Sequence, residues 1–162
     1  MTKPSYDKEY LDAAQKEIGA MIDIAVHYLN YKPQDFFDLF LKNSYSKRIE
    51  SGDPFVIWGK SGTELAFEIA QVDIGKYKSK LESNGLILHR SPEYWAGWSV
   101  AYYQWKTGNS FNTINSKIPF EKIISLYNPY HEMDVLHFVD KLNSIISPKS
   151  QFQSVIASRY NQ

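Results

Sequence analysis

Residues 6–31, YDKEYLDAAQKEIGAMIDIAVHYLNY, carry the clearest helical pattern in the chain. Apolar side chains recur along this stretch at spacings of three and four residues, at Leu11, Ala14, Ile18, Met21, Ala25 and Leu29. This period predicts an α-helix from about Tyr6 to Tyr31 with one buried face. Pro33 is expected to end it, because the residue before a proline disfavours helical dihedral angles.

Working outward, the same pattern and the usual helix-start residues predict further helices. Pro33 begins one that runs to about Ile49, and Ser61 or Thr63 caps the next. The later helices are expected at about 91–106, 111–117, 119–127 and 132–147.

Strand signals are few. The apolar run 55–58 and the run 86–88 are the two candidates for a short two-stranded element, although 53–59 fits a buried extended link better. We therefore predict an all-α fold, a compact bundle of about six helices in a single domain over 1–162. The softest point for a division is 73–90.

Composition excludes several classes of protein. The 18 Lys and Arg balance 18 Asp and Glu, which argues against a nucleic-acid partner because phosphate contacts need an excess of basic residues. The sequence has no Cys, so it has no disulfide, thiolate metal site or Cys nucleophile. No apolar run approaches the length of a membrane span and no signal peptide is evident, so we expect a soluble cytoplasmic protein.

The motifs with known chemistry do not fit. Gly59-Lys60-Ser61-Gly62 lacks the glycine of a phosphate-binding loop, since Pro54 stands five residues before Gly59 and has no amide hydrogen. His131 and His137 are six residues apart and face different sides of a helix, which disfavours a metal site. No serine nucleophile motif is present. We predict no catalytic residue, cofactor or metal, and consider an enzyme the less favoured class.

Aromatic residues make up 15% of the chain and form a stripe over 94–105. A buried core is the favoured interpretation, and Trp98→Ala is then expected to cost about 3–5 kcal/mol if the ring is fully buried. Residues near the ends of the C-terminal helices are the candidates for contact with a partner protein, with a core or capping role as the alternative for each. They are Tyr103, Gln104, Tyr127, Tyr130 and His131.

Three segments carry a resemblance: GKSGTELA at 59–66, SPEYWAGWSVAYYQW at 91–105, and SLY at 125–127 followed by HEMD at 131–134. In this order they resemble a family of small uncharacterised bacterial proteins, common in Firmicutes. Members of that family are often encoded in toxin–antitoxin-like cassettes, some beside predicted ADP-ribosyltransferase-type toxins. The resemblance spans about Asp35 to Ile146 and supplies no catalytic residues.

The resemblance implies an antitoxin- or immunity-like protein that binds and restrains a partner protein, such as a toxin encoded nearby. Two other classes remain open. One is a small intracellular enzyme whose residues assemble from distant positions. The other is a helix-turn-helix regulator over 33–71, which the acidic residues Glu64 and Glu68 disfavour.

Overall fold

The computed structural model describes residues 3–77 and 91–147, and within these ranges the chain is helical with no strand. The α-helices are α1 (Leu11–His27), α2 (Pro33–Lys42), α3 (Ser44–Glu50), α4 (Pro54–Ile57), α5 (Gly62–Ala70), α7 (Pro92–Thr107), α8 (Phe111–Lys117), α9 (Phe120–Ser125), α10 (Tyr127–Tyr130) and α11 (Val135–Ile146). Two 3₁₀ turns, η1 (Lys8–Tyr10) and η2 (Ile74–Tyr77), complete the list. The prediction of an all-α fold is confirmed.

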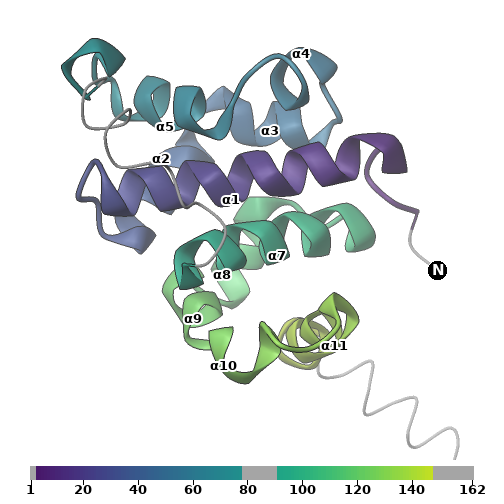
Figure 1. Ribbon diagram of the computed structural model, residues 1–162. Coiled ribbons are helices and arrows are strands. Elements are labelled where there is room, and N and C mark those ends of the chain that lie inside the picture. The colour runs from purple at the N-terminus through teal and green to yellow at the C-terminus, as the bar shows by residue number, and fades with distance from the viewer. Residues whose placement is uncertain (1–2, 78–90, 148–162) are drawn as a thin grey trace, which may run out of the picture.

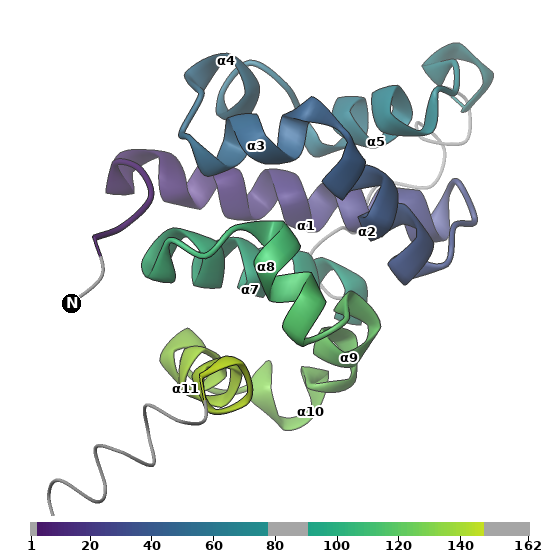
Figure 2. The ribbon, with the colours of Figure 1, turned by 180° about the vertical axis from the view of Figure 1, so that it is seen from behind.

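The helices surround α1, which lies in the middle of the molecule (Figure 1). Helices α3, α4 and α5 lie on one side of α1, and α7 lies on the other side, with α9 to α11 beyond it (Figures 1 and 2). Glycine permits the close approach of α7, because a Cβ atom on Gly97 would lie 2.9 Å from the Ile18 carbonyl oxygen. The amphipathic stretch found in the sequence thus forms the centre of the fold.

A cluster of phenylalanines joins α2 to α8 and α9. The rings of Phe37 and Phe120 are stacked, with centroids 4.4 Å apart and planes at 8°. Phe111 lies edge-on to both Phe37 and Phe40, and all four rings are buried. This cluster fixes the C-terminal helices to the N-terminal half of the chain.

Local capping signals predicted several helix starts correctly. The Ser61 hydroxyl accepts from the Glu64 amide and the Glu64 carboxylate accepts from the Ser61 amide, which is a complete capping box. Ser91 caps α7 by accepting from the Tyr94 amide, and Gly108 ends this helix in the left-handed conformation.

Other boundaries differ from the prediction. The helix expected over 33–49 is two helices, because Asn43 adopts extended dihedral angles and caps α3 by accepting from the Tyr45 amide. The first helix starts at Leu11 after a 3₁₀ turn, and the last one starts at Val135, with Asp134 as its N-cap.

The expectation of a strand or buried extended link over 55–58 is wrong, since residues 54–57 form α4. The other candidate strand, 86–88, lies outside the described residues, as does most of the predicted soft division at 73–90. No helix among the described residues combines the length and apolar character that crossing a membrane requires.

Candidate protein-interaction surface

Helix α4 and its C-cap residue expose two large aromatic side chains. Phe55 is 79% exposed and Trp58 is 58% exposed, the two highest values among the large hydrophobic residues that the structure describes. They lie three residues apart and point outward, whereas Val56 and Ile57 between them are buried. A four-residue helix can bury only one face, so the placement of Val56 and Ile57 leaves both rings in solvent.

Polar contacts hold α4 in this orientation. The Asp53 carboxylate caps the helix by accepting from the Phe55 amide at 2.9 Å, and Pro54 occupies the first turn. The other Asp53 oxygen accepts from Arg48 Nε at 2.8 Å, which ties α4 to α3. The Arg48 guanidinium holds the pKa of Asp53 below its usual value. The exposed rings therefore stand on a fixed turn.

Tyr10 extends the aromatic area. Its ring lies against Trp58 with centroids 4.5 Å apart and planes at 50°. Immediately after Trp58 the chain turns so tightly that a Cβ atom on Gly59 would lie 2.1 Å from the Phe55 carbonyl oxygen. We call the side chains of Tyr10, Phe55 and Trp58 the aromatic surface.

A charged network joins α3 and α5 to Lys60, which lies between α4 and α5, two residues after Trp58. Lys60 Nζ lies 2.7 Å from Glu68 Oε1, and the Tyr45 hydroxyl donates to the other Glu68 oxygen. The Tyr45 ring is also near two cations, Lys60 and Arg48, at 5.7 and 5.8 Å from its centroid. The hydrogen bond to Glu68 raises the pKa of Tyr45, and the hydrogen bond from Lys60 lowers the pKa of Glu68. This network, with the aromatic surface, combines the residue types that dominate protein interfaces.

A second polar cluster joins α1 to the start of α7. His27 Nε2 lies 3.2 Å from Glu93 Oε2 and 3.7 Å from Asp23 Oδ1. The Ser91 hydroxyl donates directly to the buried Asp23 carboxylate and also caps α7. In a nucleophilic triad the serine hydroxyl donates to the histidine, whereas Ser91 donates to Asp23. The cluster is therefore a structural contact.

No group of His, Asp and Glu residues within 3–77 and 91–147 is placed to hold a metal ion.

The structure separates the five residues that were predicted to contact a partner. Tyr103 and Gln104 are buried, at 1% and 2% exposure, which places them in the interior and removes them from any such contact. The Tyr103 hydroxyl donates to Asn143 Oδ1 at 2.7 Å, and Gln104 Nε2 donates to Ser5 Oγ at 2.9 Å. These contacts join segments far apart in sequence.

The other three predicted residues lie together in and after α10. The rings of Tyr127 and His131 are stacked at 3.8 Å, and Tyr127 lies edge-on to Trp95 on α7. His131 Nδ1 lies 2.6 Å from the Tyr127 carbonyl oxygen, so this histidine makes a local hydrogen bond. Tyr130 is half-buried against the core. These residues stay candidates, but each has a packing role.

Sequence reasoning missed the aromatic surface because the run 53–59 was interpreted as buried. The signal was present: Asp53-Pro54 is a helix start, and a helix places residues 55 and 58 on one face.

No protein-family model matches the chain, and no curated protein and no solved structure is significantly similar to it. The surface itself therefore provides the argument for function.

Proposed function

We propose that the protein binds and restrains a partner protein, in the manner of an antitoxin or immunity protein acting in the cytoplasm, and that the aromatic surface makes the contact. The observation that carries this proposal is the exposure of Phe55 and Trp58, three residues apart, at one capped helical turn. Large aromatic side chains that are exposed close together are typical of interaction sites, and buried Trp, Tyr and Arg side chains contribute most of the affinity of many interfaces.

The resemblance inferred from the sequence, to a family of small bacterial proteins that are often encoded in toxin–antitoxin-like cassettes, implies the same class of function. Its first segment, 59–66, begins immediately after Trp58 and contains Lys60 of the charged network. The aromatic surface thus adjoins one of the segments that carry the resemblance.

The charge of α5 disfavours the alternative function, a helix-turn-helix regulator that binds DNA. Glu64 and Glu68 are the exposed residues of this helix within 62–70, and the helix carries no Lys or Arg. A helix with two exposed carboxylates is repelled by the phosphate backbone of DNA.

The test is co-expression with the product of the adjacent gene. We expect the neighbour to slow growth when expressed alone, and the protein to restore growth and to co-purify with it. The Phe55→Ala/Trp58→Ala variant is expected to lose both effects, with affinity lowered at least tenfold, because two anchors are removed.

Met133→Ala/Leu136→Ala is the matched control, since these two residues are 44% and 46% exposed. Met133 precedes α11 and Leu136 lies in it, and α11 is far from α4 (Figure 1). We expect this variant to behave like the unaltered protein. A neighbour that is not toxic, or rescue that survives the loss of Phe55 and Trp58, would contradict the proposal.

A further inference from the structure

A groove of about 420 Å³ lies along α5 and the turn that follows this helix. Three of its lining residues are apolar: Phe67 in α5, and Val72 and Ile74 after it. Phe67 is buried, whereas Ile74 is 44% exposed. The groove thus has an apolar lining, part of which is left in solvent.

Every charged residue that lines the groove is acidic. These residues are Glu64, Glu68 and Asp73. Glu64 and Glu68 are four residues apart in α5, so their side chains lie on the same face of the helix. Glu68 is paired with Lys60 at 2.7 Å, but among the described residues Glu64 and Asp73 form no ion pair. Two negative charges at the groove are therefore uncompensated.

The sequence around the groove has the same charge. Residues 61–75 include three acidic residues and no Lys, Arg or His, although the chain as a whole is neutral. The lining also contains Gln71, whose side-chain amide can both donate and accept a hydrogen bond. The groove therefore combines negative charge and an apolar lining with an amide group.

We propose that this groove binds a basic, partly apolar peptide segment, in which Lys or Arg residues flank an aliphatic side chain. The aliphatic side chain lies against Phe67 and Ile74, and the cations lie beside Glu64 and Asp73. A peptide main chain also offers a partner to the Gln71 amide. An anionic ligand such as a nucleic acid is repelled by the carboxylates, and an uncharged ligand leaves their charge uncompensated.

The charged network joins the groove to the aromatic surface. Lys60 lies two residues after Trp58 and is paired with Glu68, which lines the groove. A partner that covers Trp58 is thus brought beside the groove. The assignment of the basic segment to the restrained partner protein rests on the proposed function.

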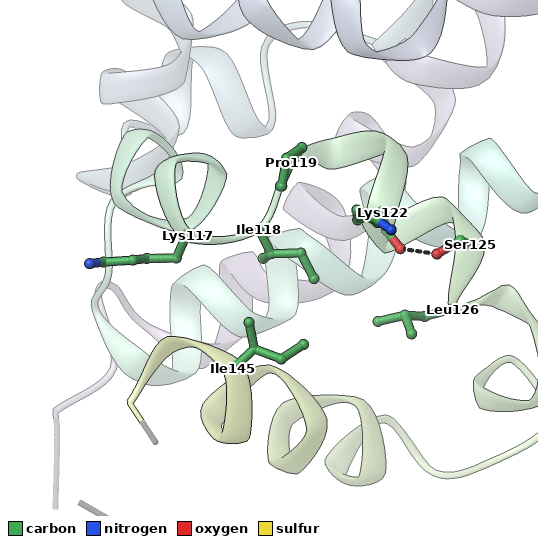
Figure 3. A pocket seen from close by; sticks show the side chains of 7 residues that line it. All are labelled: Lys117, Ile118, Pro119, Lys122, Ser125, Leu126 and Ile145. Atoms are coloured by element: carbon green, nitrogen blue, oxygen red, sulfur yellow. Dashed lines mark hydrogen bonds between the residues drawn. The ribbon is translucent and has the colours of Figure 1, made fainter. Parts of the chain in front are cut away.

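A hollow of about 400 Å³ beside α11 differs from this groove (Figure 3). Its side chains Ile118, Leu126 and Ile145 point toward one another, but Lys117 extends away from them on the opposite side from Lys122. The two cations are therefore apart, and this hollow presents no charge pattern that selects a ligand.

The first experiment is a titration of the full-length ¹⁵N-labelled protein with two peptides, followed by NMR. The peptides are acetyl-GKLLKG-amide and acetyl-GELLEG-amide, which differ only in the sign of their charge. We expect saturable amide shifts at Phe67, Gln71 and Ile74 with the lysine peptide and none with the glutamate peptide. Raising the salt concentration from about 0.05 to 0.5 M should weaken the binding several-fold, because salt screens exposed charges.

Glu64→Gln/Asp73→Asn is expected to lower the affinity for the lysine peptide several-fold. Both substitutions retain a side-chain oxygen that can accept from the amides of Ser61 and Gly75, so the local hydrogen bonds are kept. A loss of affinity in this variant therefore reports on charge.

Glu121→Gln/Asp140→Asn is the matched control, because it changes the net charge by the same amount. These exposed residues lie in α9 and α11, on the other side of α1 from α5 (Figure 1). We expect this variant to bind the lysine peptide as the unaltered protein does.

The product of the adjacent gene tests whether the basic segment belongs to the restrained partner. Glu64→Gln/Asp73→Asn should lower its affinity several-fold, whereas Phe55→Ala/Trp58→Ala should leave the affinity for the lysine peptide unchanged. The two proposals thus fail separately. A neighbour that does not bind contradicts the proposed function, and the peptide titration still decides whether the groove binds a basic segment.

Several results would overturn the inference. They are no saturable binding of the lysine peptide, equal affinity for the two peptides, equal effects of the two charge variants, or unaltered binding of the neighbour by Glu64→Gln/Asp73→Asn. Shifts at the same amides on dilution of the free protein would place a second copy in the groove. The same shifts in Lys78→Gln/Lys80→Gln without peptide would place another segment of this chain there.

Discussion

A Cβ atom at Gly62 would lie 2.5 Å from the carbonyl oxygen of Glu17, so α5 crosses α1 with backbone nearly against backbone. The same atom would lie 2.6 Å from Ala20 Cβ and 2.8 Å from the Met21 nitrogen. Two of these three neighbours are backbone atoms, which cannot move without moving the whole of α1. The crossing therefore depends on the absence of a side chain at Gly62.

We expect Gly62→Ala to lower the free energy of unfolding by about 1–3 kcal/mol, because the two helices must separate to admit a methyl group. Urea denaturation followed by circular dichroism measures this change. Gly75→Ala is the control, since its Cβ would meet only the Asp73 carboxylate, at 3.2 Å or more. Equal stabilities of the two variants would show that α5 moves freely over α1.

The Glu17 carboxyl group makes stability depend on pH. Burial raises its pKa to about 7, and the negative charge of Glu64 acts in the same direction. One of its oxygens, Oε2, is buried without a hydrogen-bond partner among the described residues. In the unfolded chain the group titrates near the ordinary glutamate pKa of 4.5, so the folded protein holds this proton more tightly than the unfolded chain.

The sign follows from this difference. Below about pH 4.5 both states are protonated and Glu17 does not destabilise the fold, whereas between pH 4.5 and 7 the unfolded state alone loses its proton. Stability is therefore expected to fall as pH rises through this window and to stay low above it. Glu17→Gln should remove that part of the decline and raise stability at pH 8, as measured by urea denaturation at pH 5 and pH 8.

Glu64→Gln is the comparison, because it removes only the smaller, coulombic cause and leaves the burial of Glu17 unchanged. We expect it to reduce the pH dependence less than Glu17→Gln does. If Glu17→Gln and the unaltered protein show the same difference between pH 5 and pH 8, the Glu17 side chain is ionised in the folded state throughout.

Two tryptophans on α7 differ in burial and should differ in their effect on stability. Trp105 is buried at 7% exposure, and its Nε1 donates to the Tyr6 carbonyl oxygen at 2.8 Å. Trp98 is only half-buried, so the condition for a 3–5 kcal/mol loss at this position is not met. We expect Trp105→Ala to cost about 3–5 kcal/mol and Trp98→Ala about 1–2 kcal/mol, measured by urea denaturation. The reverse order would contradict the packing of α7.

Signals that act within a few residues were sufficient to predict much of the fold. The helix starts at Ser61 and Ser91 are set by a side chain three residues from the amide that it accepts from. The central helix follows from one apolar face that is buried over its whole length, from Leu11 to Ala25. Such patterns need no knowledge of what packs against them.

Exposure was harder to predict, because it depends on distant segments. Gln104 lies near the end of α7, where a side chain is often exposed. It is buried because the N-terminal segment packs over it, and its Nε2 donates to Ser5 Oγ, 99 residues earlier in the sequence. Phe55 and Trp58 are as apolar as the core residues, yet the orientation of α4 leaves them outside, and part of that orientation comes from the contact of Asp53 with Arg48. Contacts of this kind leave no periodic pattern in the sequence.

The exposure of Phe55 and Trp58 predicts that their removal affects binding without unfolding the protein. In the double variant Phe55→Ala/Trp58→Ala the losses within the fold are the contact of Trp58 with Tyr10, worth about 0.5–1.5 kcal/mol beyond the area buried, and the partial burial of the Trp58 side chain. Phe37→Ala provides the scale for a core residue, because its buried ring stacks on Phe120, and is expected to cost about 3–5 kcal/mol. The measurement is urea denaturation by far-ultraviolet circular dichroism, which does not depend on the tryptophan removed. A loss in the double variant as large as that in Phe37→Ala would assign both rings to the core, and the aromatic surface would then no longer explain how a partner is bound.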